Sequence, residues 1–548
     1  MSSGVIANMS TRFSNTLAIE HLESRLNLST LNALLSDVPA TADTVVAQEV
    51  SQPRIYRSDA LSNQAATEAA TYGNQWKNAE SPDAQKFFEQ FKSEFQTPSP
   101  FLNPPEPTPD PEPTPDPTPD PDPTPEPDPE PGPDPELPPP PPPPSPPPPP
   151  PPSVNNPVTI SQVQMGNFTR LVITGTSGND SIVVSQSGST LTIVANGQTH
   201  TATGNFTELA IYGLDGNDNI TVQSSVNIIT LLYGGSGNNN LTAAGSNQNF
   251  IVTVGGSGHN VVTGNGINTA FWVAAGDTVN ASAKEIAAGG VHTVNSFYGG
   301  VSTQLNGQNL PNPTDSGRTE NYKNYSLFGA SPLHTDINQG QVGDCYFLAV
   351  ISSFAYSAPN QLMQMAVDLG DGTYAVQFKR GGTTTYVRVD ADLPMSGSSL
   401  LFNKIKPGGA IWGCIMEKAY AFFRTGAGTY ASLNSGWTGS VYTDLGVSNS
   451  TFLTNVDAAA LYNTISKALT NNKAISIISM TSTSSPVVAS HAYSIFDAYT
   501  SNGTMYVVLK NPWGFDGGGS KDSNPNDGLI TLTIAQLQAN FSMGSIAV

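Results

Sequence analysis

Cysteine, basic residues and long apolar runs are all scarce in this sequence. Cys345 and Cys414 are the two cysteines among 548 residues, so at most one disulfide can form and no disulfide framework holds the fold. Lys and Arg number 22 against 43 Asp and Glu, and the net charge of −21 provides no basic stripe to neutralise phosphates. No run of about 18 apolar residues occurs. We therefore expect no nucleic-acid partner and no membrane-spanning helix.

The first 96 residues are polar and modestly helical. They lack the basic and then apolar run of an ordinary signal peptide, but LESRLNLS from Leu22 resembles a Leu-Glu-x-Arg motif near the start of many exported bacterial proteins. The clearest helix spans 81–95, with Ser81 as its cap and Pro82 in its first turn. We interpret residues 1–96 as a small helical segment, with a pro-segment or docking helix as the alternative. A secreted or cell-surface location is favoured, and a cytoplasmic one stays open.

Residues 97–157 hold most of the proline. Of 46 prolines, 33 lie between Pro98 and Pro152, together with 11 acidic residues and no basic residue. Proline fixes φ and removes the amide donor, so this stretch favours polyproline II over a packed fold. At about 3.1 Å per residue it spans roughly 170 Å. We expect a disordered, acidic linker that separates modules.

Residues 158–290 carry an irregular repeat of nine-residue units rich in Gly, Asn and Asp. The units GTSGNDSIV, GLDGNDNIT, GGSGNNNLT and GGSGHNVVT start at Gly175, Gly213, Gly234 and Gly255, which are 38, 21 and 21 residues apart. Short alternating strands lie between the units. Glycine turns that alternate with short strands at a repeated coil length predict a parallel β-solenoid. Its simplest role is that of a structural stalk or adhesive module with cell-surface contacts.

These units resemble the calcium-binding nonapeptide GGxGxDxUx of secreted repeat-in-toxin proteins. In that family the Asp at the sixth position helps to ligate calcium between stacked turns. Asp180 and Asp218 keep this residue, whereas Asn239 and Asn260 replace it. Because calcium prefers carboxylate oxygen, the asparagines favour side-chain ladders over a hard cation. Asp180 and Asp218 remain the candidate metal ligands of the repeat.

The stretch INQGQVGDCYFLAV places Cys345 at the start of a helix. Two glycines allow a sharp turn before it, Asp344 is a candidate helix cap, and an apolar run from Tyr346 continues to about residue 357. A helix N-terminus stabilises thiolate over thiol, so this position predicts a lowered thiol pKa and a nucleophile. The alternative is an inert cysteine that packs as a small hydrophobe, which is the role expected of Cys414.

A general base for Cys345 is available further along the chain. After residue 320 the histidines are His334 and His491, and His491 directly precedes an alternating strand in VVASHAYSIFDAY. Asn511 follows the next strand, 511 − 491 = 20 residues later, in VVLKNPWG. An asparagine on a neighbouring strand end can hold one imidazole nitrogen and aim the other at a thiol. The order Cys, His, Asn is typical of papain-like cysteine peptidases.

The segment QGQVGDC, residues 339–345, resembles the QGxxGDC signature of the calpain cysteine peptidases. VRVDADLP from Val387, LLFNK followed by AIWGCIMEKAYAFF, SHAYSI and KNPWG resemble further motifs of that family in the expected order, over about 325–548. The resemblance implies a papain-like α+β domain. It also implies roles for five residues: Cys345 as nucleophile, His491 as general base, Asn511 as its orienter, Gln339 as oxyanion donor with the Cys345 backbone amide, and Trp513 as a shield of the His–Asn hydrogen bond.

Calcium is suggested by both resemblances, but its ligands are incomplete. Asp336, in HTDINQG, matches one calcium ligand of the calpain protease core, and Ala431 stands where family members place a glutamate. A single carboxylate makes a weak site. We therefore expect that the chemistry requires no cofactor, with calcium as the alternative, and that any calcium effect arises in the repeat region.

Together these features predict a multidomain protein. Its parts are a helical segment at 1–96, a proline-rich linker at 97–157, a β-solenoid at 158–290, a connector at 291–319 and a papain-like α+β catalytic domain at 320–548. The predicted function is a bacterial cysteine endopeptidase that acts on proteins or peptides. A surface-binding protein with a vestigial protease domain is one alternative, which the complete Cys-His-Asn-Gln set disfavours. An acyl transferase of papain-like fold is the other, and Asn511 in place of an aspartate favours the peptidase.

Overall fold

The computed structural model describes residues 157–244, 253–255, 258–517 and 524–548. The helix expected at 81–95 and the proline-rich linker up to residue 156 lie outside these ranges. Within the described ranges no helix is both long and apolar enough to cross a membrane.

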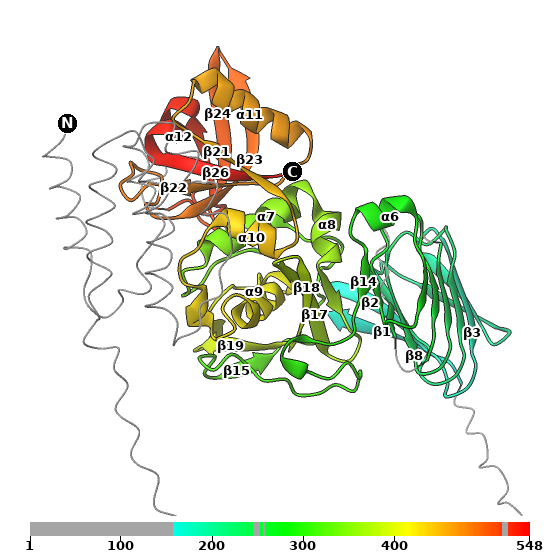
Figure 1. Cartoon of the computed structure of the whole chain (residues 1–548). Coiled ribbons are helices and arrows are strands. Elements are labelled where there is room, and N and C mark those ends of the chain that lie inside the picture. The colour runs from blue at the N-terminus through cyan, green and yellow to red at the C-terminus, as the bar shows by residue number, and fades with distance from the viewer. Residues whose placement is uncertain (1–156, 245–252, 256–257, 518–523) are drawn as a thin grey trace, which may run out of the picture. The chain divides into compact units, whose positions relative to one another are not determined.

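Two seven-stranded sheets make up residues 159–293, which we call the two-sheet region (Figure 1). In spatial order the first sheet consists of β1 (Thr159–Met165), β2 (Phe168–Thr174), β6 (Glu208–Tyr212), β8 (Ile229–Gly235), β10 (Thr253–Gly255), β12 (Phe271–Val273) and β14 (Val291–Thr293). The second consists of β13 (Thr278–Asn280), β11 (Val261–Thr263), β9 (Asn240–Ala243), β7 (Asn219–Val222), β3 (Ser181–Ser187), β4 (Thr190–Ala195) and β5 (Gln198–Thr203). A short helix, α6 (Ala283–Ala287), follows β13.

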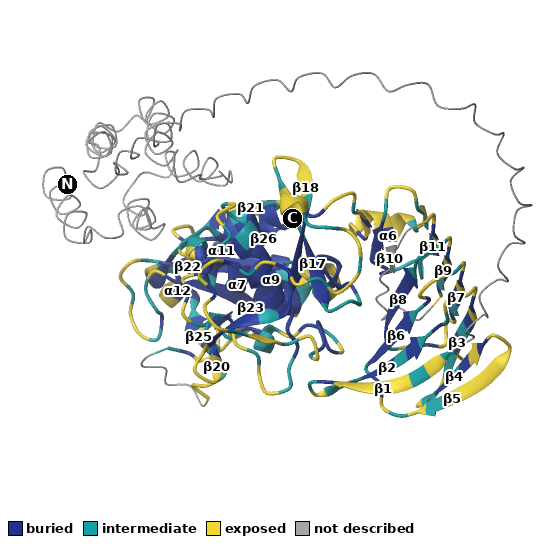
Figure 2. Cartoon of the chain, turned by 90° about the horizontal axis from the view of Figure 1, so that it is seen from below, coloured by how far each residue is buried: buried dark blue, intermediate teal, exposed yellow. Residues whose placement is uncertain are grey.

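The chain alternates between these sheets, and successive passes pair in parallel. Ile220 on β7 lies opposite Leu241 on β9, which in turn lies opposite Val262 on β11, so these two passes each advance the chain by 21 residues. The next pass, from β11 to β13, advances it by 17. The 38-residue spacing between the first two units arises because the antiparallel strands β4 and β5 are inserted after β3. Apolar side chains of both sheets fill the space between them, whereas β5 and most of β1 are exposed (Figure 2).

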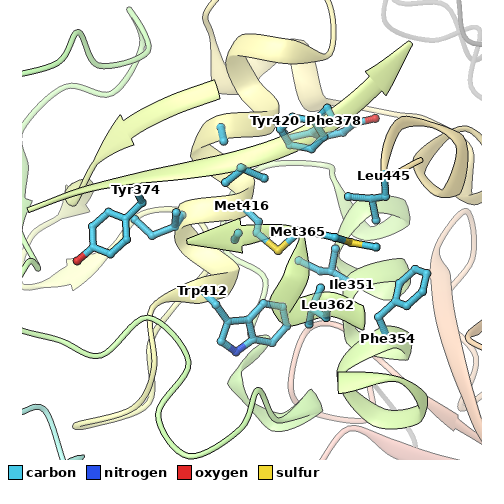
Figure 3. Close-up of a cluster of buried hydrophobic side chains, with 14 of the residues drawn as sticks. Ile351, Phe354, Leu362, Met365, Tyr374, Phe378, Trp412, Met416, Tyr420 and Leu445 are labelled. Carbon is cyan, nitrogen blue, oxygen red and sulfur yellow. The ribbon is translucent and has the colours of Figure 1, made fainter. Parts of the chain in front are cut away.

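The rest of the described chain surrounds a central buried helix, α7 (Cys345–Ser357). Ten consecutive residues from Tyr346 to Ala355 are buried, as expected for a helix that is apolar on all sides. Around it lie α8 (Pro359–Gln364), α9 (Trp412–Phe423), α10 (Thr438–Asp444) and the antiparallel strands β16 (Ala366–Asp368), β17 (Thr373–Arg380) and β18 (Thr383–Asp390). Figure 3 shows how Ile351 and Phe354 of α7 gather in one core with Met416 and Tyr420 of α9.

A six-stranded antiparallel sheet forms the C-terminal part of the chain (Figure 1). Its spatial order is β21 (Asn449–Leu453), β26 (Phe541–Ala547), β22 (Ile475–Ser479), β23 (Ala492–Ser501), β24 (Thr504–Lys510) and β25 (Leu529–Thr533). The helices α11 (Ala458–Thr470) and α12 (Ile534–Asn540) share a second apolar core with it. A small sheet of β15 (Thr319–Asn321), β19 (Asp392–Ser396) and β20 (Ser399–Leu400) completes the fold. The result is the mixed α/β content expected of a papain-like protease domain.

The two-sheet region contacts the α7-centred part through a buried ion cluster. The Arg170 guanidinium on β2 bonds Glu208 at 2.7 Å and Asp368, at the end of β16, at 3.0 Å. The Ser326 hydroxyl also donates to Glu208, and the Tyr233 hydroxyl donates to the Asp368 carbonyl at 3.1 Å. Because the side chains of the ion pairs are at most 8 % exposed, each charge depends on its partner for stabilisation.

An aromatic contact continues the same interface. The Trp272 ring stacks on His292 with ring centroids 4.3 Å apart and meets the edge of Tyr386 at 5.5 Å. His292 Nδ1 lies 2.7 Å from Gln377 Oε1 on β17. Trp272 and Tyr233 belong to the same hydrophobic core as α7 and α9. Side chains of the two-sheet region and of the α7-centred part therefore share one continuous hydrophobic core.

Candidate active site

The loop before Cys345 is fixed by close backbone approaches. A Cβ atom on Gly340 would lie 2.1 Å from the carbonyl oxygen of Phe402, so only glycine fits there. The backbone N–H of Gln339 donates to the carbonyl of Pro512 at 2.8 Å. This bond holds the loop next to the chain segment that follows β24. α7 then begins at Cys345, where the sequence places the helix start.

His491 and Asn511 meet because β23 and β24 are antiparallel neighbours. His491 directly precedes β23, Asn511 directly follows β24, and Ser494 pairs with Lys510 between them. The His491 Nε2 and Asn511 Oδ1 atoms are 2.8 Å apart. Ser490, just before the histidine, has a φ of 54°, a left-handed conformation that is uncommon for a non-glycine residue. The structure thus brings together the two residues that the sequence paired.

The hydrogen bonds of Asn511 determine which imidazole nitrogen carries the proton. Its Oδ1 also accepts the backbone N–H of Trp513 at 3.0 Å, so this atom is the amide oxygen and not the nitrogen. The amide nitrogen donates to the Asp516 carbonyl at 3.4 Å. His491 Nε2 must therefore be the donor towards Oδ1. In the neutral ring this leaves Nδ1 with a free lone pair that can accept a proton.

Cys345 lies against the start of β23. The backbone N–H of Ala492, the residue after His491, hydrogen-bonds the thiol. A bond of 2.7 Å from the Ser494 hydroxyl to the Ala349 carbonyl ties the same strand to α7. The Cys345 residue keeps part of its surface exposed, whereas Cys414 is buried and donates to the Asn403 carbonyl at 3.1 Å. Of the two cysteines, Cys345 is therefore the one placed to meet both a base and a substrate.

Burial keeps both reacting groups uncharged. It raises the pKa of the Cys345 thiol to about 12, although the Ala492 N–H opposes the shift. Burial also lowers the pKa of His491 to about 4, against the opposing effect of its bond to Asn511. This direction differs from the lowered thiol pKa expected at a helix start, because loss of water around the sulfur outweighs the backbone donors. Burial thus favours the neutral forms of the thiol and the imidazole.

Trp513 covers one side of the imidazole. The ring centroids of His491 and Trp513 are 4.7 Å apart, and Phe515, which is 48 % exposed, lies 5.5 Å from the indole. Asn511 is completely buried. An indole in this position keeps water from the His–Asn hydrogen bond, which strengthens it.

The Gln339 side chain is buried, and its amide is bound within its own loop. Its Nε2 donates to the Val342 carbonyl at 2.7 Å and to Asp344 Oδ1 at 3.2 Å. The Gln339 amide is therefore bonded to the side chain of Asp344, the residue before Cys345. To serve as an oxyanion donor, it must exchange one of these bonds for the substrate oxygen.

Asp344 occupies the cap position of α7 but does not cap it. Its side chain accepts no bond from the first turn of the helix. The carboxyl group instead faces Gln339 and the Glu417 carboxyl of α9, both buried. The cap expected from the sequence is therefore wrong, because buried tertiary partners are available. Glu417 was not singled out from the sequence, although an acid inside the apolar helix IMEKAY is a signal that could have identified it.

Asp336, the candidate calcium ligand of the protease core, is already engaged by donors. Its Oδ2 accepts the Trp412 indole N–H at 2.8 Å and the Leu333 backbone N–H at 2.9 Å. The described residues contain no group of three or more His, Cys, Asp or Glu side chains arranged to hold a metal. Asp336 with these partners does not match the open carboxylate set that calcium binds.

Asp180 and Asp218 lie on neighbouring passes of the two-sheet region and belong to a side-chain ladder. The backbone N–H groups of Asp180, Asp218, Asn239 and Asn260 donate to the side-chain oxygens of Asp218, Asn239, Asn260 and Asp277 at 2.8, 2.9, 3.1 and 2.8 Å. The ladder favoured by the asparagines is thus present, and the carboxylates are part of it. Asp180 also accepts from Thr176 and Asn196. Asp180 Oδ1 and Oδ2 and Asp218 Oδ1 thus accept from N–H donors, and Asp218 Oδ2 alone accepts none from the described residues.

Comparison with known proteins places the site in a family. Residues 312–524 match the model of the calpain family cysteine protease. The chain is 28% identical to the calpain-1 catalytic subunit of Bos taurus over 249 residues, covering 41% of this chain and 34% of that protein. It is 31% identical to the calpain-2 catalytic subunit and to calpain-8, both of Homo sapiens, over 200 residues, covering 33% of this chain and 28% of each relative.

The C-terminal segment 312–524 is therefore a calpain-family cysteine protease domain. The chain spans about a third of the length of the curated relatives it matches.

Proposed function

We propose that this protein is a cysteine endopeptidase that hydrolyses peptide bonds in proteins through a Cys345–His491–Asn511 triad and an acyl-enzyme. The observation that carries the proposal is the bond of 2.8 Å between His491 and Asn511 at strand ends that lie against the N-terminus of α7. A thiol, a base and an orienter for that base are thereby combined.

In the proposed reaction His491 Nδ1 takes the Cys345 proton as the sulfur attacks the substrate carbonyl. The backbone amide of Cys345 and the Gln339 side chain donate to the oxyanion. The imidazolium then protonates the leaving amine, and the thioester remains on Cys345. His491 next activates a water molecule, which releases the acid and restores the thiol. Asn511 accepts the Nε2–H throughout, so that Nδ1 is the nitrogen that takes and returns the proton.

The proposal is tested by incubating the full chain with an unfolded protein substrate and analysing the products by mass spectrometry. Hydrolysis yields new carboxyl termini. An acyl transferase would instead join acyl groups to an added amine, and a vestigial domain would leave the substrate intact. We expect cleavage products with free carboxyl termini even with a primary amine present. Intact substrate or amine-linked products would contradict the peptidase proposal.

The proposed oxyanion role of Gln339 gives a second prediction. Replacing Gln339 with alanine is expected to lower kcat by about 10²–10³-fold with little change in KM, because an oxyanion donor acts mainly in the transition state. Gln341 is the matched control, since it lies in the same turn with an exposed side chain. Gln341→Ala should keep wild-type turnover. Equal turnover of the two variants would remove Gln339 from the site.

Calcium independence of the chemistry is a further proposal. Asp336, Asp180 and Asp218 accept bonds from N–H groups, and Ala431 supplies no carboxylate. We expect the full chain to cleave peptides in the presence of a chelator at nearly the rate found in millimolar calcium. Peptidase rates measured across a calcium titration check this. A rate near zero in chelator that rises steeply at micromolar calcium would contradict it.

We also propose the modular organisation that the sequence suggests. Residues 158–290 are interpreted as a parallel β-solenoid with degenerate repeat-in-toxin-like units, and the prolines of 97–157 as a spacer that separates it from the N-terminal segment. The parallel passes of 21 residues support the solenoid. We further propose a bacterial, exported or surface-exposed protein, with unfolded or flexible proteins as substrates. Detection of the native chain in the medium or on the cell surface tests the location.

A further inference from the structure

Two buried carboxyl groups meet directly behind the nucleophile. The side chains of Asp344, before α7, and Glu417, on α9, lie within hydrogen-bonding reach of each other. Their residues are 0 % and 2 % exposed. Asp344 Oδ1 accepts the Gln339 amide at 3.2 Å, and the Glu417 oxygens accept the Asn403 backbone N–H at 3.0 and 3.2 Å. Among the described residues no amide, hydroxyl or cationic group donates to Asp344 Oδ2.

This contact requires a proton between the two groups. An ionised carboxylate only accepts hydrogen bonds, so two ionised carboxylates cannot bond each other. Two adjacent buried carboxylates also repel strongly, and such a pair retains one proton that both share. The absence of another donor to Oδ2 leaves the Glu417 carboxyl as the group that satisfies it.

We propose that Asp344 and Glu417 share one proton and form a positioning pair that holds the Gln339 amide next to Cys345. The proposal rests on the endopeptidase function and adds that this pair positions the oxyanion donor, Gln339. The remaining charge of the pair is held by the Gln339 amide and the Asn403 N–H. While the proton is present, the loop 339–344 stays in place. When the proton leaves, repulsion between the carboxylates separates them and displaces Gln339.

The surroundings of the pair agree with proton retention near neutral pH. Burial raises the pKa of Asp344 to about 7, and burial together with the Asp344 charge raises the pKa of Glu417 well above its usual value. The Arg424 guanidinium opposes the shift of Asp344. The other titratable groups that interact with the pair are Cys345, Tyr346, Cys414 and Tyr430. Burial raises the pKa of each of these four groups, so all of them are neutral at pH 7.

The decisive variant is Glu417→Gln in the full chain. Glutamine keeps the shape and can accept the Asn403 N–H while its amide donates to Asp344 without a titrating proton. We expect wild-type kcat to fall at alkaline pH, where Glu417 releases the shared proton, approaching tenfold per pH unit with KM nearly constant. Glu417→Gln should match wild type near pH 7 and keep its kcat over the alkaline range in which wild type loses it. Glu417→Ala should lose kcat at every pH, because it leaves the Asp344 charge buried without its partner.

Lys510 also titrates near the site. Comparing wild type with Glu417→Gln distinguishes its effect on kcat from that of the carboxyl pair. Burial lowers the pKa of Lys510 to about 8, and the Glu417 substitutions leave it unchanged. An alkaline decrease caused by Lys510 would therefore persist in Glu417→Gln. Persistence of the wild-type decrease in that variant, or identical pH profiles of kcat for the two proteins, overturns the proposal.

A measurement without substrate distinguishes failure of this inference from failure of the peptidase function. Infrared spectra at pH 6 should show a stronger carbonyl band of protonated, buried carboxylic acid in wild type than in Glu417→Gln, since carboxyls such as Asp218, whose pKa burial raises to about 6, contribute in both proteins. In addition, the native pair keeps its shared proton beyond pH 7, whereas the unfolded carboxyls release theirs near pH 4. Wild-type Tm should therefore decrease between pH 4 and 7 more than that of Glu417→Gln. Identical bands and identical slopes in both proteins would refute the shared proton even in an active enzyme.

Discussion

Replacing Cys345 with alanine is expected to abolish peptide cleavage by the full chain and to leave its fold intact. The change removes the sulfur that forms the acyl-enzyme, and loss of a nucleophile of this kind costs about 10⁶-fold in turnover. The residue is at the first position of α7 and only partly buried, so alanine fits there without creating a core cavity. Activity on an unfolded protein and the circular dichroism spectrum of the variant check both parts of the prediction.

Cys414 provides the matched control. It lies on α9 and packs against the β19–β20 segment, and its buried thiol donates to the Asn403 carbonyl. Cys414→Ala should therefore keep most of its kcat and lose some stability. Likewise, His491→Ala should be inactive. His334→Ala should retain activity, because the His334 ring only meets the stacked rings of Tyr356 and Phe496 edge-on. A Cys345→Ala protein that cleaves at the wild-type rate, or a folded Cys414→Ala protein that does not cleave, contradicts the assignment.

Replacing Arg170 with methionine is expected to destabilise the protein by about 3–5 kcal/mol. The substitution leaves the carboxylates of Glu208 and Asp368 buried without their cation, and breaking a buried pair by removing one partner has this cost. Because Asp368 ends β16 next to the core of α7, the effect should reach the protease domain. Urea unfolding and loss of peptidase activity with rising temperature measure it.

Arg318→Met is the control for this prediction. Arg318 pairs with Glu320 at 2.8 Å, but their side chains are 61% and 49% exposed, so the loss should stay below about 1 kcal/mol. The triple change Arg170→Met with Glu208→Gln and Asp368→Asn should recover part of the stability, because it removes the stranded charges. An Arg170→Met protein as stable as Arg318→Met would show that the two-sheet region and the protease domain do not stabilise each other.

Local sequence was sufficient for much of the site. The helix start at Cys345 follows from glycines that allow a tight turn and an apolar run that needs burial, and α7 spans 345–357 as expected. His491 and Asn511 flank two alternating strands joined by a short turn, so an antiparallel pair brings them together. The asparagines at the sixth position of the repeat predicted a side-chain ladder, since a periodic chain stacks identical residues.

Only the tertiary structure decided the electrostatics around these residues. The sequence predicts that Asp344 caps a helix. In the structure its carboxyl group instead pairs with that of Glu417, 73 residues further along the chain. The thiol pKa follows the burial of Cys345 beneath β23 and not its place at a helix end. The partner of Arg170 across the interface, Asp368, lies 198 residues along the chain. Sequence determines local geometry through short-range sterics and periodicity. Charge states depend on which distant groups exclude water and face one another, and that is fixed only when the chain packs.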